Sequence, residues 1–295
     1  LGRDAITKHF NTYPQGDARY SETSAELIAD SESALADVKR YYNDVFGLGL
    51  GYIAVVGDFD AAEVTAELKA DVIDQKAAKI PFERIVAEYR PVEPARFVID
   101  TPDKENAMLF ARVDLPANLS DADMPALITA DWIIGGSDGL SNRIVNRLRQ
   151  KEGLSYGSGS NITLPSFGNR AKWSVGAIVA PQNLAQAEKS LKDELARAYR
   201  DGITEAELAE AKRGIIGSRA VNRAQDGMVA SNWVNNLETG RTWQFSKETE
   251  AAIEALTVED VNKALRRFCD VSKLTFALAG DLAKAKAAGK DFTQP

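Results

Sequence analysis

Arg149 and Tyr156 are the residues of this chain whose types and spacing best suit chemistry on a carbonyl group. They lie seven residues apart in the sequence, on either side of a turn expected at Gly153. Arginine is always charged and tyrosine carries a phenol O–H, so together they could bind a carbonyl oxygen that becomes an oxyanion. The plainer alternative is a solvated arginine near a helix end and a tyrosine that packs where a strand begins.

The residues before this pair predict the elements that would hold it in place. Residues 140–151 are expected to form a short amphipathic helix with Leu140, Ile144 and Leu148 on its buried face. Gly153 would let the chain turn sharply into the next strand. The two candidate side chains would then lie near one edge of a sheet and face a cleft.

Histidine and cysteine are nearly absent from the chain. The 295 residues include one histidine, His9, and one cysteine, Cys269, so no internal disulfide is possible. Catalytic zinc usually takes three protein ligands, and histidine is prominent among them. We therefore expect no metal site on this chain, and a structural histidine near Phe10 and Tyr13.

The glycine-containing segments 135–139 and 52–57 do not predict a nucleotide site. The first lies between expected helices, and the second lacks the further glycines of a dinucleotide-binding loop. Turn and cap glycines explain both segments.

Composition excludes two further classes of partner. The chain is 44% hydrophobic and has 36 basic against 43 acidic residues, a net charge of −7. An acidic chain without a basic cluster is a poor nucleic-acid binder. No apolar run approaches the roughly 20 residues that span a bilayer.

The opening Leu1-Gly2-Arg3 shows no signal peptide, which leaves the compartment unknown; for a bacterial protein it would be periplasmic or cytoplasmic.

The order of elements predicts an α+β fold, a two-layer sandwich whose mixed, mostly antiparallel sheet is packed by helices. The expected strands are 96–100, 107–115, 156–164, 171–179 and 274–279, with residues 165–169 as a hairpin turn. The expected helices are 25–29, 34–46, 61–73, 123–134, 140–151, 184–198, 222–237 and two that start at capping boxes, 204–207 and 257–260.

The chain also repeats itself weakly. Residues 35–46 resemble 258–269, and residues 52–59 resemble 275–282, both at an offset of 223. Each copy reads as an acidic-started helix, a short loop, an apolar strand and Gly-Asp, so residues 52–56 are expected to be a strand. The repeat predicts that residues 1–93 are the C-terminal piece of a preceding homologous repeat plus a linker, and that residues 94–295 are a complete domain.

The segment Gly135-Gly-x-x-Gly-Leu-Ser-x-Arg143, followed by Leu148-Arg-Gln-Lys-x-Gly-Leu-Ser-Tyr156, resembles the C-terminal-half motif of the pitrilysin/insulinase family of zinc peptidases. The mitochondrial processing peptidase belongs to that family. The resemblance implies two duplicated halves that close around a peptide. The first half carries the zinc motif H-x-x-E-H, and the second supplies an arginine and a tyrosine at the spacing of Arg149 and Tyr156.

This chain has no H-x-x-E-H, so the resemblance gives it no zinc ligand. It implies that the chain is the C-terminal half of a zinc metalloendopeptidase, with Arg149 and Tyr156 as catalytic residues that stabilise the oxyanion. The zinc, the cofactor of the parent enzyme, would lie on an N-terminal half in the same or a separate chain, and the substrate would be a peptide. The alternative is a non-catalytic scaffold or peptide-binding subunit of the same family. On either reading the chain alone is expected to be inactive.

Overall fold

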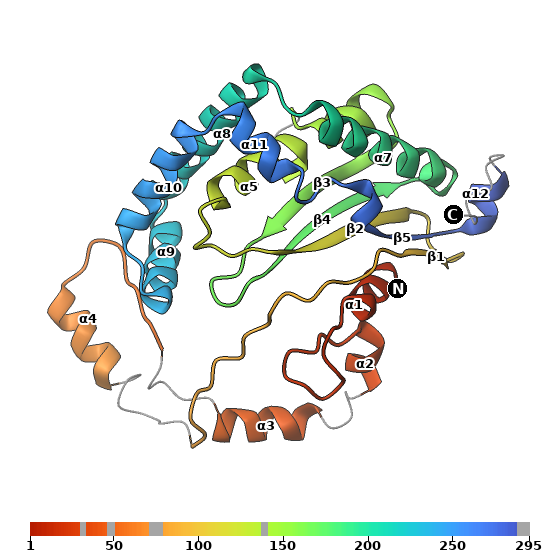
Figure 1. Ribbon diagram of the computed structural model, residues 1–295. Helices are drawn as coiled ribbons and strands as arrows, with labels where there is room; N and C mark the ends of the chain where they lie inside the picture. The colour runs from red at the N-terminus through yellow and green to blue at the C-terminus, as the bar shows by residue number, and fades with distance from the viewer. Residues whose placement is uncertain (30–33, 46–50, 71–78, 137–140, 288–295) are drawn as a thin grey trace. The chain divides into compact units, whose positions relative to one another are not determined.

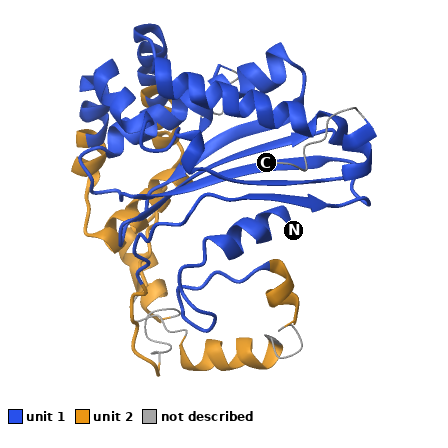
Figure 2. Ribbon diagram, turned by 45° about the vertical axis from the view of Figure 1, so that its right-hand side comes forward, with its two compact units in different colours: residues 1–23, 86–215, 249–295 blue, residues 24–85, 216–248 orange. Residues whose placement is uncertain are grey.

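The structure is a computed structural model that describes residues 1–29, 34–45, 51–70, 79–136 and 141–287 (Figure 1). The chain separates into two compact units, coloured in Figure 2. Unit 1 comprises residues 1–23, 86–215 and 249–295, and unit 2 comprises residues 24–85 and 216–248. Among the residues described, no helix combines the length and the apolar character that crossing a membrane requires.

A five-stranded sheet is the centre of unit 1. Its strands lie in the order β1-β5-β2-β4-β3. The pair β1 and β5 is parallel, and every other neighbouring pair is antiparallel. The strands are β1 (Arg96–Asp100), β2 (Ala107–Pro116), β3 (Ser155–Thr163), β4 (Arg170–Val179) and β5 (Thr275–Gly280). This mixed, mostly antiparallel sheet packed by helices confirms the predicted fold class.

Helices cover one face of the sheet. Successive side chains of β4 point to opposite faces of the sheet, and Trp173, Val175 and Ala177 point to the helical face and are buried. Figure 1 shows α5 (Met124–Asp131), α7 (Leu184–Asp201) and α11 (Val258–Leu265) lying over this face. The core between the two layers includes Leu109, Leu127, Leu191, Leu195, Leu265 and Phe268.

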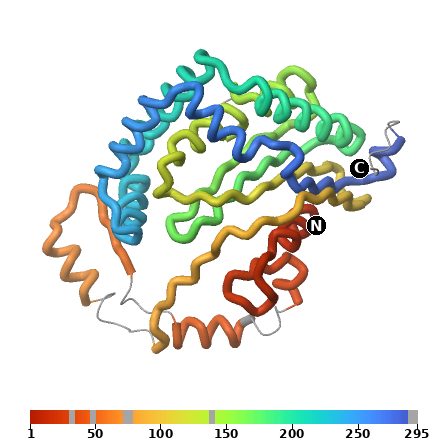
Figure 3. The backbone as a smooth tube through the Cα atoms, in the orientation of Figure 1, coloured from red at the N-terminus to blue at the C-terminus, as the bar shows by residue number. Residues whose placement is uncertain are grey.

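One helix lies on the opposite face. In α1 (Gly2–His9), Ile6 is buried, and together with Phe10 it packs on Ala277 of β5. The first residues of the chain therefore pack on the same sheet as the C-terminal strand, and Figure 3 lets the path between them be followed. Within the expected segment 1–93, residues 1–23 and 86–93 group with this sheet, whereas residues 24–85 belong to unit 2.

The predicted helix boundaries hold where the chain carries explicit end signals. Helix α7 ends at Asp201 and is capped by Gly202, whose φ of 73° lies in the left-handed region. Helix α8 (Glu205–Arg223) begins after Thr204, whose hydroxyl and backbone N–H engage Glu207. A complete capping box of Thr257 and Asp260 starts α11, as predicted.

Other boundaries differ from the prediction. The helix predicted over 222–237 begins at Asp226, because α8 continues to Arg223 and a short turn separates the two helices. The end of helix 61–73 and the residue Leu140 fall outside the described residues. The remaining helical elements are α2 (Ser24–Ala29), α3 (Ala34–Asp44), α4 (Ala61–Leu68), α9 (Asp226–Thr239), α10 (Trp243–Ala255), α12 (Leu282–Ala287), η6 (Pro181–Asn183) and η7 (Val271–Lys273).

The predicted strand 52–56 is wrong. These residues lie in no sheet, and Tyr52, Ile53, Val55 and Val56 expose their side chains. A strand needs a neighbour for its backbone hydrogen bonds, and the described chain offers none to this segment. The two segments that resemble each other in sequence are therefore not structurally equivalent here, since residues 275–280 form the fully buried β5.

Candidate functional site

Arg149 and Tyr156 lie on the two sides of a helix-to-strand turn in unit 1. The short helix α6 (Arg143–Val145) continues directly into the π-helical turn η5 (Asn146–Lys151), which carries Arg149. Gly153 follows with a φ of 60°, and the N–H of Leu154 donates to the carbonyl of Leu148 at 2.7 Å. The predicted turn at Gly153 is thus confirmed, and it rests on a left-handed backbone that favours glycine.

The inner side of this helical segment is anchored in the core. Ile144 and Leu148 are fully buried, as the amphipathic pattern predicts. Asn142 caps the segment, since its side chain accepts a hydrogen bond from the N–H of Val145 at 2.9 Å. Anchors on one side leave Arg149, on the other side, exposed.

A β-bulge directs Tyr156 outward. Ser155 pairs with Val179 and Gly157 pairs with Ile178, so Tyr156 is an extra residue in β3 without a partner on β4. Ser155 fixes the bulge, because its hydroxyl donates to the carbonyl of Ile178 at 2.8 Å. A bulge bends a strand and re-aims its side chain, and the side chain of Tyr156 is 88% exposed.

The turn and the bulge bring the two side chains together. The guanidinium carbon of Arg149 lies 5.7 Å from the centre of the Tyr156 ring. Within the described part of the chain, neither the guanidinium nor the phenol O–H has a hydrogen-bond partner. Both groups thus keep their donors available to a ligand.

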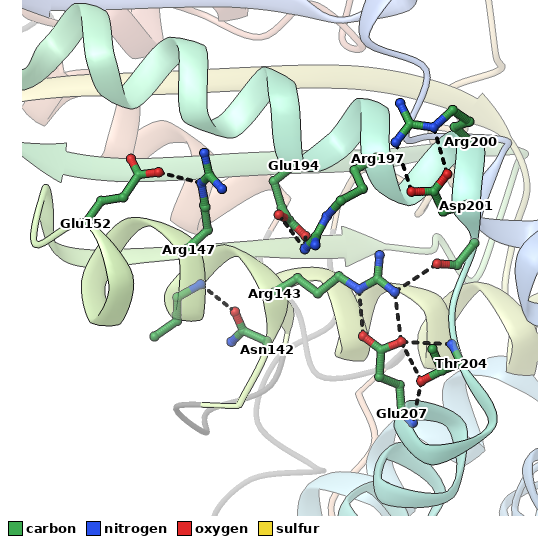
Figure 4. Close-up of polar contacts among 12 residues, drawn as sticks. Asn142, Arg143, Arg147, Glu152, Glu194, Arg197, Arg200, Asp201, Thr204 and Glu207 are labelled. Atoms are coloured by element: carbon green, nitrogen blue, oxygen red, sulfur yellow. Dashed lines mark hydrogen bonds and ion pairs between the residues drawn. The ribbon is translucent and has the colours of Figure 1, made fainter.

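An ion pair that was not predicted from the sequence supports this helical segment. Arg143 donates to both carboxylate oxygens of Glu207, at 2.7 and 2.8 Å, and to the carbonyl of Gly202 (Figure 4). Burial alone would raise the pKa of Glu207, but Arg143 and Thr204 lower it below its ordinary value. The fork ties α6 to the start of α8, and its only sequence signal was the place of Arg143 in the motif.

A buried carboxylate also holds β3 and was not predicted. Asp131 accepts hydrogen bonds from the hydroxyl of Ser160 at 2.6 Å, the indole N–H of Trp173 at 2.7 Å and the N–H of Ile162 at 3.1 Å. Burial raises the pKa of Asp131 above its ordinary value. An aspartate in an otherwise apolar helix, α5, was the available signal.

The described residues contain no group of three or more histidine, cysteine, aspartate or glutamate side chains arranged to hold a metal ion. His9 packs edge-on against Phe10 and Phe97, and its Nε2 lies 2.8 Å from the carbonyl oxygen of Glu93. Cys269 is buried, and burial raises the pKa of its thiol. Neither residue lies in a setting that suits a metal ligand or a nucleophile.

The chain resembles solved structures of known proteins. The peptidase M16 inactive domain from Pseudomonas fluorescens matches 95% of this chain and 65% of its own, with a TM-score of 0.77 and 22% identity. A conserved protein from Enterococcus faecalis V583 matches 95% of this chain and 63% of its own, with a TM-score of 0.67 and 17% identity. A protease from Helicobacter pylori matches 76% of this chain and 53% of its own, with a TM-score of 0.63 and 18% identity. The chain therefore spans less than two thirds of each of these structures, and the likeness establishes a shared fold.

The sequence itself identifies the family. No match is found among curated proteins. Residues 34–215, more than half of the chain, match the family described as peptidase M16 inactive domain. This agrees with the pitrilysin/insulinase motif around Arg149 and Tyr156 and with the observed fold. The chain belongs to the peptidase M16 family, as a form of its inactive C-terminal domain.

Proposed function

We propose that this chain is the C-terminal half of a zinc metalloendopeptidase and that it closes over a peptide substrate. The observation that carries the proposal is the pair of free donors, Arg149 and Tyr156, which a π-helical turn and a β-bulge hold beside each other at the surface. A lone solvated arginine would not need a glycine turn to reach a tyrosine. A packing tyrosine would not be 88% exposed.

Each residue has a distinct role in this proposal. The Arg149 guanidinium provides a permanent positive charge and several N–H donors toward the carbonyl oxygen of the scissile bond. The Tyr156 O–H provides a neutral donor to the same oxygen. Both interactions strengthen as negative charge develops on that oxygen, so they lower the barrier and not merely the dissociation constant.

Zinc would belong to an N-terminal half, in the same or a separate chain. The described residues of this chain do not fit a zinc site. When bound to that half, the metal would activate the water that attacks the peptide. A similar solved structure is described as the inactive peptidase domain of a putative zinc protease from Bordetella parapertussis, and this description favours a zinc-bearing parent.

The test uses the protein completed by its zinc-bearing half. Tyr156→Phe and Arg149→Ala should each lower kcat about 100-fold, roughly 3 kcal/mol, as the loss of one oxyanion donor does in other enzymes. Metal content and thermal stability should stay as in the parent, because neither residue is a ligand or part of the core. Lys189→Gln, at an exposed position of α7, is the control for a generic loss of positive charge.

The alternative is a non-catalytic scaffold or peptide-binding subunit of the same family. It predicts that the completed assembly has no peptidase activity for the two variants to lower. A near-normal kcat in both variants of an active enzyme would instead remove Arg149 and Tyr156 from the site while leaving the enzyme assignment in place.

We also propose that residues 1–93 contain the end of a preceding homologous repeat and a linker, and that residues 94–295 form a complete domain. Apolar residues of the first copy are exposed, whereas those 223 positions later are buried, as expected for a segment without its own sheet. The exposed residues are Val38, Tyr41, Tyr42, Ile53 and Val55, and their buried counterparts are Val261, Ala264, Leu265, Phe276 and Leu278.

A further inference from the structure

A groove of about 540 Å³ lies on the face of the sheet that α1 only partly covers. Its floor is formed by β2, β4 and β3, and Arg3, Ile6 and Thr7 of α1 form one wall. Gly157, the residue after Tyr156, lines one end of the groove. The groove is therefore next to the proposed catalytic pair without including it.

The floor changes character along the strands. Strand pairing and side-chain alternation place four rows of residues across this face of the sheet. From the Tyr156 end, the rows are Met108, Ile178 and Gly157; Phe110, Gly176 and Gly159; Arg112, Ser174 and Asn161; and Asp114, Lys172 and Thr163. The first two rows are apolar or lack a side chain, and the last two are polar and carry the charges. Six residues of β4 separate the ends, a length of about 20 Å at roughly 3.3 Å per residue.

Positive charge is in excess at the far end. The carboxylate of Asp114 is almost fully buried and is shared by Arg112 and Arg170, at 2.8 and 2.7 Å. No carboxylate pairs with Lys172 among the residues described. The groove lining at this end contains Arg112 and Lys172 and, within the described chain, no acidic residue, since Asp114 is buried and does not line the groove. This local excess contrasts with the chain's net charge of −7.

The pKa of Lys172 reflects this excess of positive charge. Partial loss of hydration and repulsion from Arg112 and Arg170 lower the pKa of Lys172 below its ordinary value, against an opposite effect of Asp114. A bound carboxylate would relieve that repulsion, because an opposite charge favours the protonated ammonium. Charge complementarity thus favours an acidic occupant over a basic or neutral one.

We infer that the groove binds an extended peptide, with acidic side chains at the Lys172 end and apolar side chains at the Tyr156 end. This inference rests on the proposed function, because it assigns a substrate class to the surface beside the same pair. In a completed enzyme it places the acidic side chains about six residues from the bond that Arg149 and Tyr156 would address. The preference would then be for substrates with an acidic segment at that separation.

The binding test uses the intact chain without any zinc-bearing half. Labelled, C-terminally amidated peptides of about eight residues carry apolar residues at one end and either Asp/Glu, Asn/Gln or Lys at the other. Fluorescence anisotropy should give an affinity for the acidic peptide about tenfold or more above the neutral one, falling as salt is added. Equal affinities for the acidic and neutral peptides would overturn the inference.

Variants locate the binding. Lys172→Gln, at an exposed side chain, should bring the acidic peptide close to the affinity of the neutral one. Lys189→Gln is the matched control, because it removes one positive charge from α7, on the other face of the sheet. Acidic-peptide binding that is unchanged in Lys172→Gln, or that Lys189→Gln weakens equally, would contradict the groove assignment. The groove assignment would also be contradicted if a neutral peptide with a free C-terminal carboxylate bound as tightly as the acidic peptide.

The result is separable from that of the proposed function. Arg149→Ala and Tyr156→Phe should leave acidic-peptide binding within about twofold, because neither residue lines the groove. Selective binding without hydrolysis in the completed protein would retain the groove and refute the peptidase. The completed protein could instead hydrolyse peptides without a preference for acidic ones, and Tyr156→Phe could lower that hydrolysis. This outcome would support the peptidase and refute the groove assignment.

Discussion

Glu188 shows how one residue joins the two layers of unit 1. It lies on α7, is buried, and receives both forked N–H groups of Arg96 on β1 at 2.8 Å and the ammonium of Lys192 at 2.7 Å. Burial by itself would raise the pKa of Glu188, but Arg96 and Lys192 lower it below its ordinary value of 4.5. The carboxylate thus stabilises the fold in its charged form.

The sign of the pH dependence follows from that direction. A carboxyl whose pKa is lower in the folded state contributes stability above its unfolded pKa and loses it as pH falls through the folded pKa. Glu188→Gln should therefore lower the free energy of unfolding by about 1–3 kcal/mol at neutral pH. The difference from the parent should shrink as pH falls below 4.5.

Urea unfolding of both proteins across this pH range checks the prediction. Asp193→Asn, on the same helix, removes an exposed pair with Lys189 and should cost about 0.5 kcal/mol or less. A Glu188→Gln deficit that stays constant down to strongly acidic pH would contradict an electrostatic origin.

The residues of the candidate site were predictable from sequence to different degrees. Arg149 and Tyr156 stood out because a local turn signal separates them at a recognisable spacing. The bulge that turns Tyr156 outward was not predictable, since it depends on the register between β3 and β4. The hydrogen bonds of Asp131 and the Arg143–Glu207 ion pair were not predicted, because the partners lie far apart in the sequence.

At the scale of elements, the close approach of the π-helical turn η4 (Trp132–Gly136) to β3 depends on glycine. A Cβ built on Gly135 would lie 2.7 Å from the backbone nitrogen of Ser160 and 2.8 Å from Cδ1 of Ile144. Atoms cannot approach this closely, so the turn or the strand would have to shift. The same glycine was expected only to end a helix.

Gly135→Ala should consequently destabilise the protein by about 1–3 kcal/mol, as insertion of a methyl group into a packed interior does. Gly217→Ala is the opposite case, because Gly217 lies at an exposed position within α8 and its Cβ would meet no atom within 4 Å. That variant should gain up to about 1 kcal/mol. Thermal melts compare the two, and a Gly135→Ala protein as stable as the parent would show that η4 can move away from β3.

Local signals account for which elements were predicted well. The hairpin of β3 and β4 and the helices that start at Thr204 and Thr257 carry their turn residues or caps within a few positions. The strand predicted over 52–56 was wrong because an apolar run does not specify which other strand would pair with it. Pairing is a property of the sheet, and periodicity cannot supply it.

At the scale of the molecule, residues 52–56 provide a test of the proposed repeat. In this chain their amides should exchange with solvent rapidly, because they belong to no sheet. In a longer protein that includes the preceding repeat, they should become at least about 100-fold more protected.

Hydrogen exchange measured on both proteins decides the matter, with the amides of β5 as the internal control. These are fully buried and should be protected in both. If residues 52–56 exchange equally fast in the longer protein, the proposed preceding repeat does not use them as a strand.

The position of β5 also has a consequence for synthesis on the ribosome. β2, β3 and β4 are neighbours in sequence and can pair soon after they emerge, but β5 can insert between β1 and β2 only after helices α7 to α11 have been synthesised. Until then β1 has no partner, and the side of β2 from Met108 to Arg112 is an open apolar edge. A nascent chain stalled before Thr275 would therefore present an aggregation-prone strand edge. We expect chaperones to remain bound to such a chain until β5 has paired with β2.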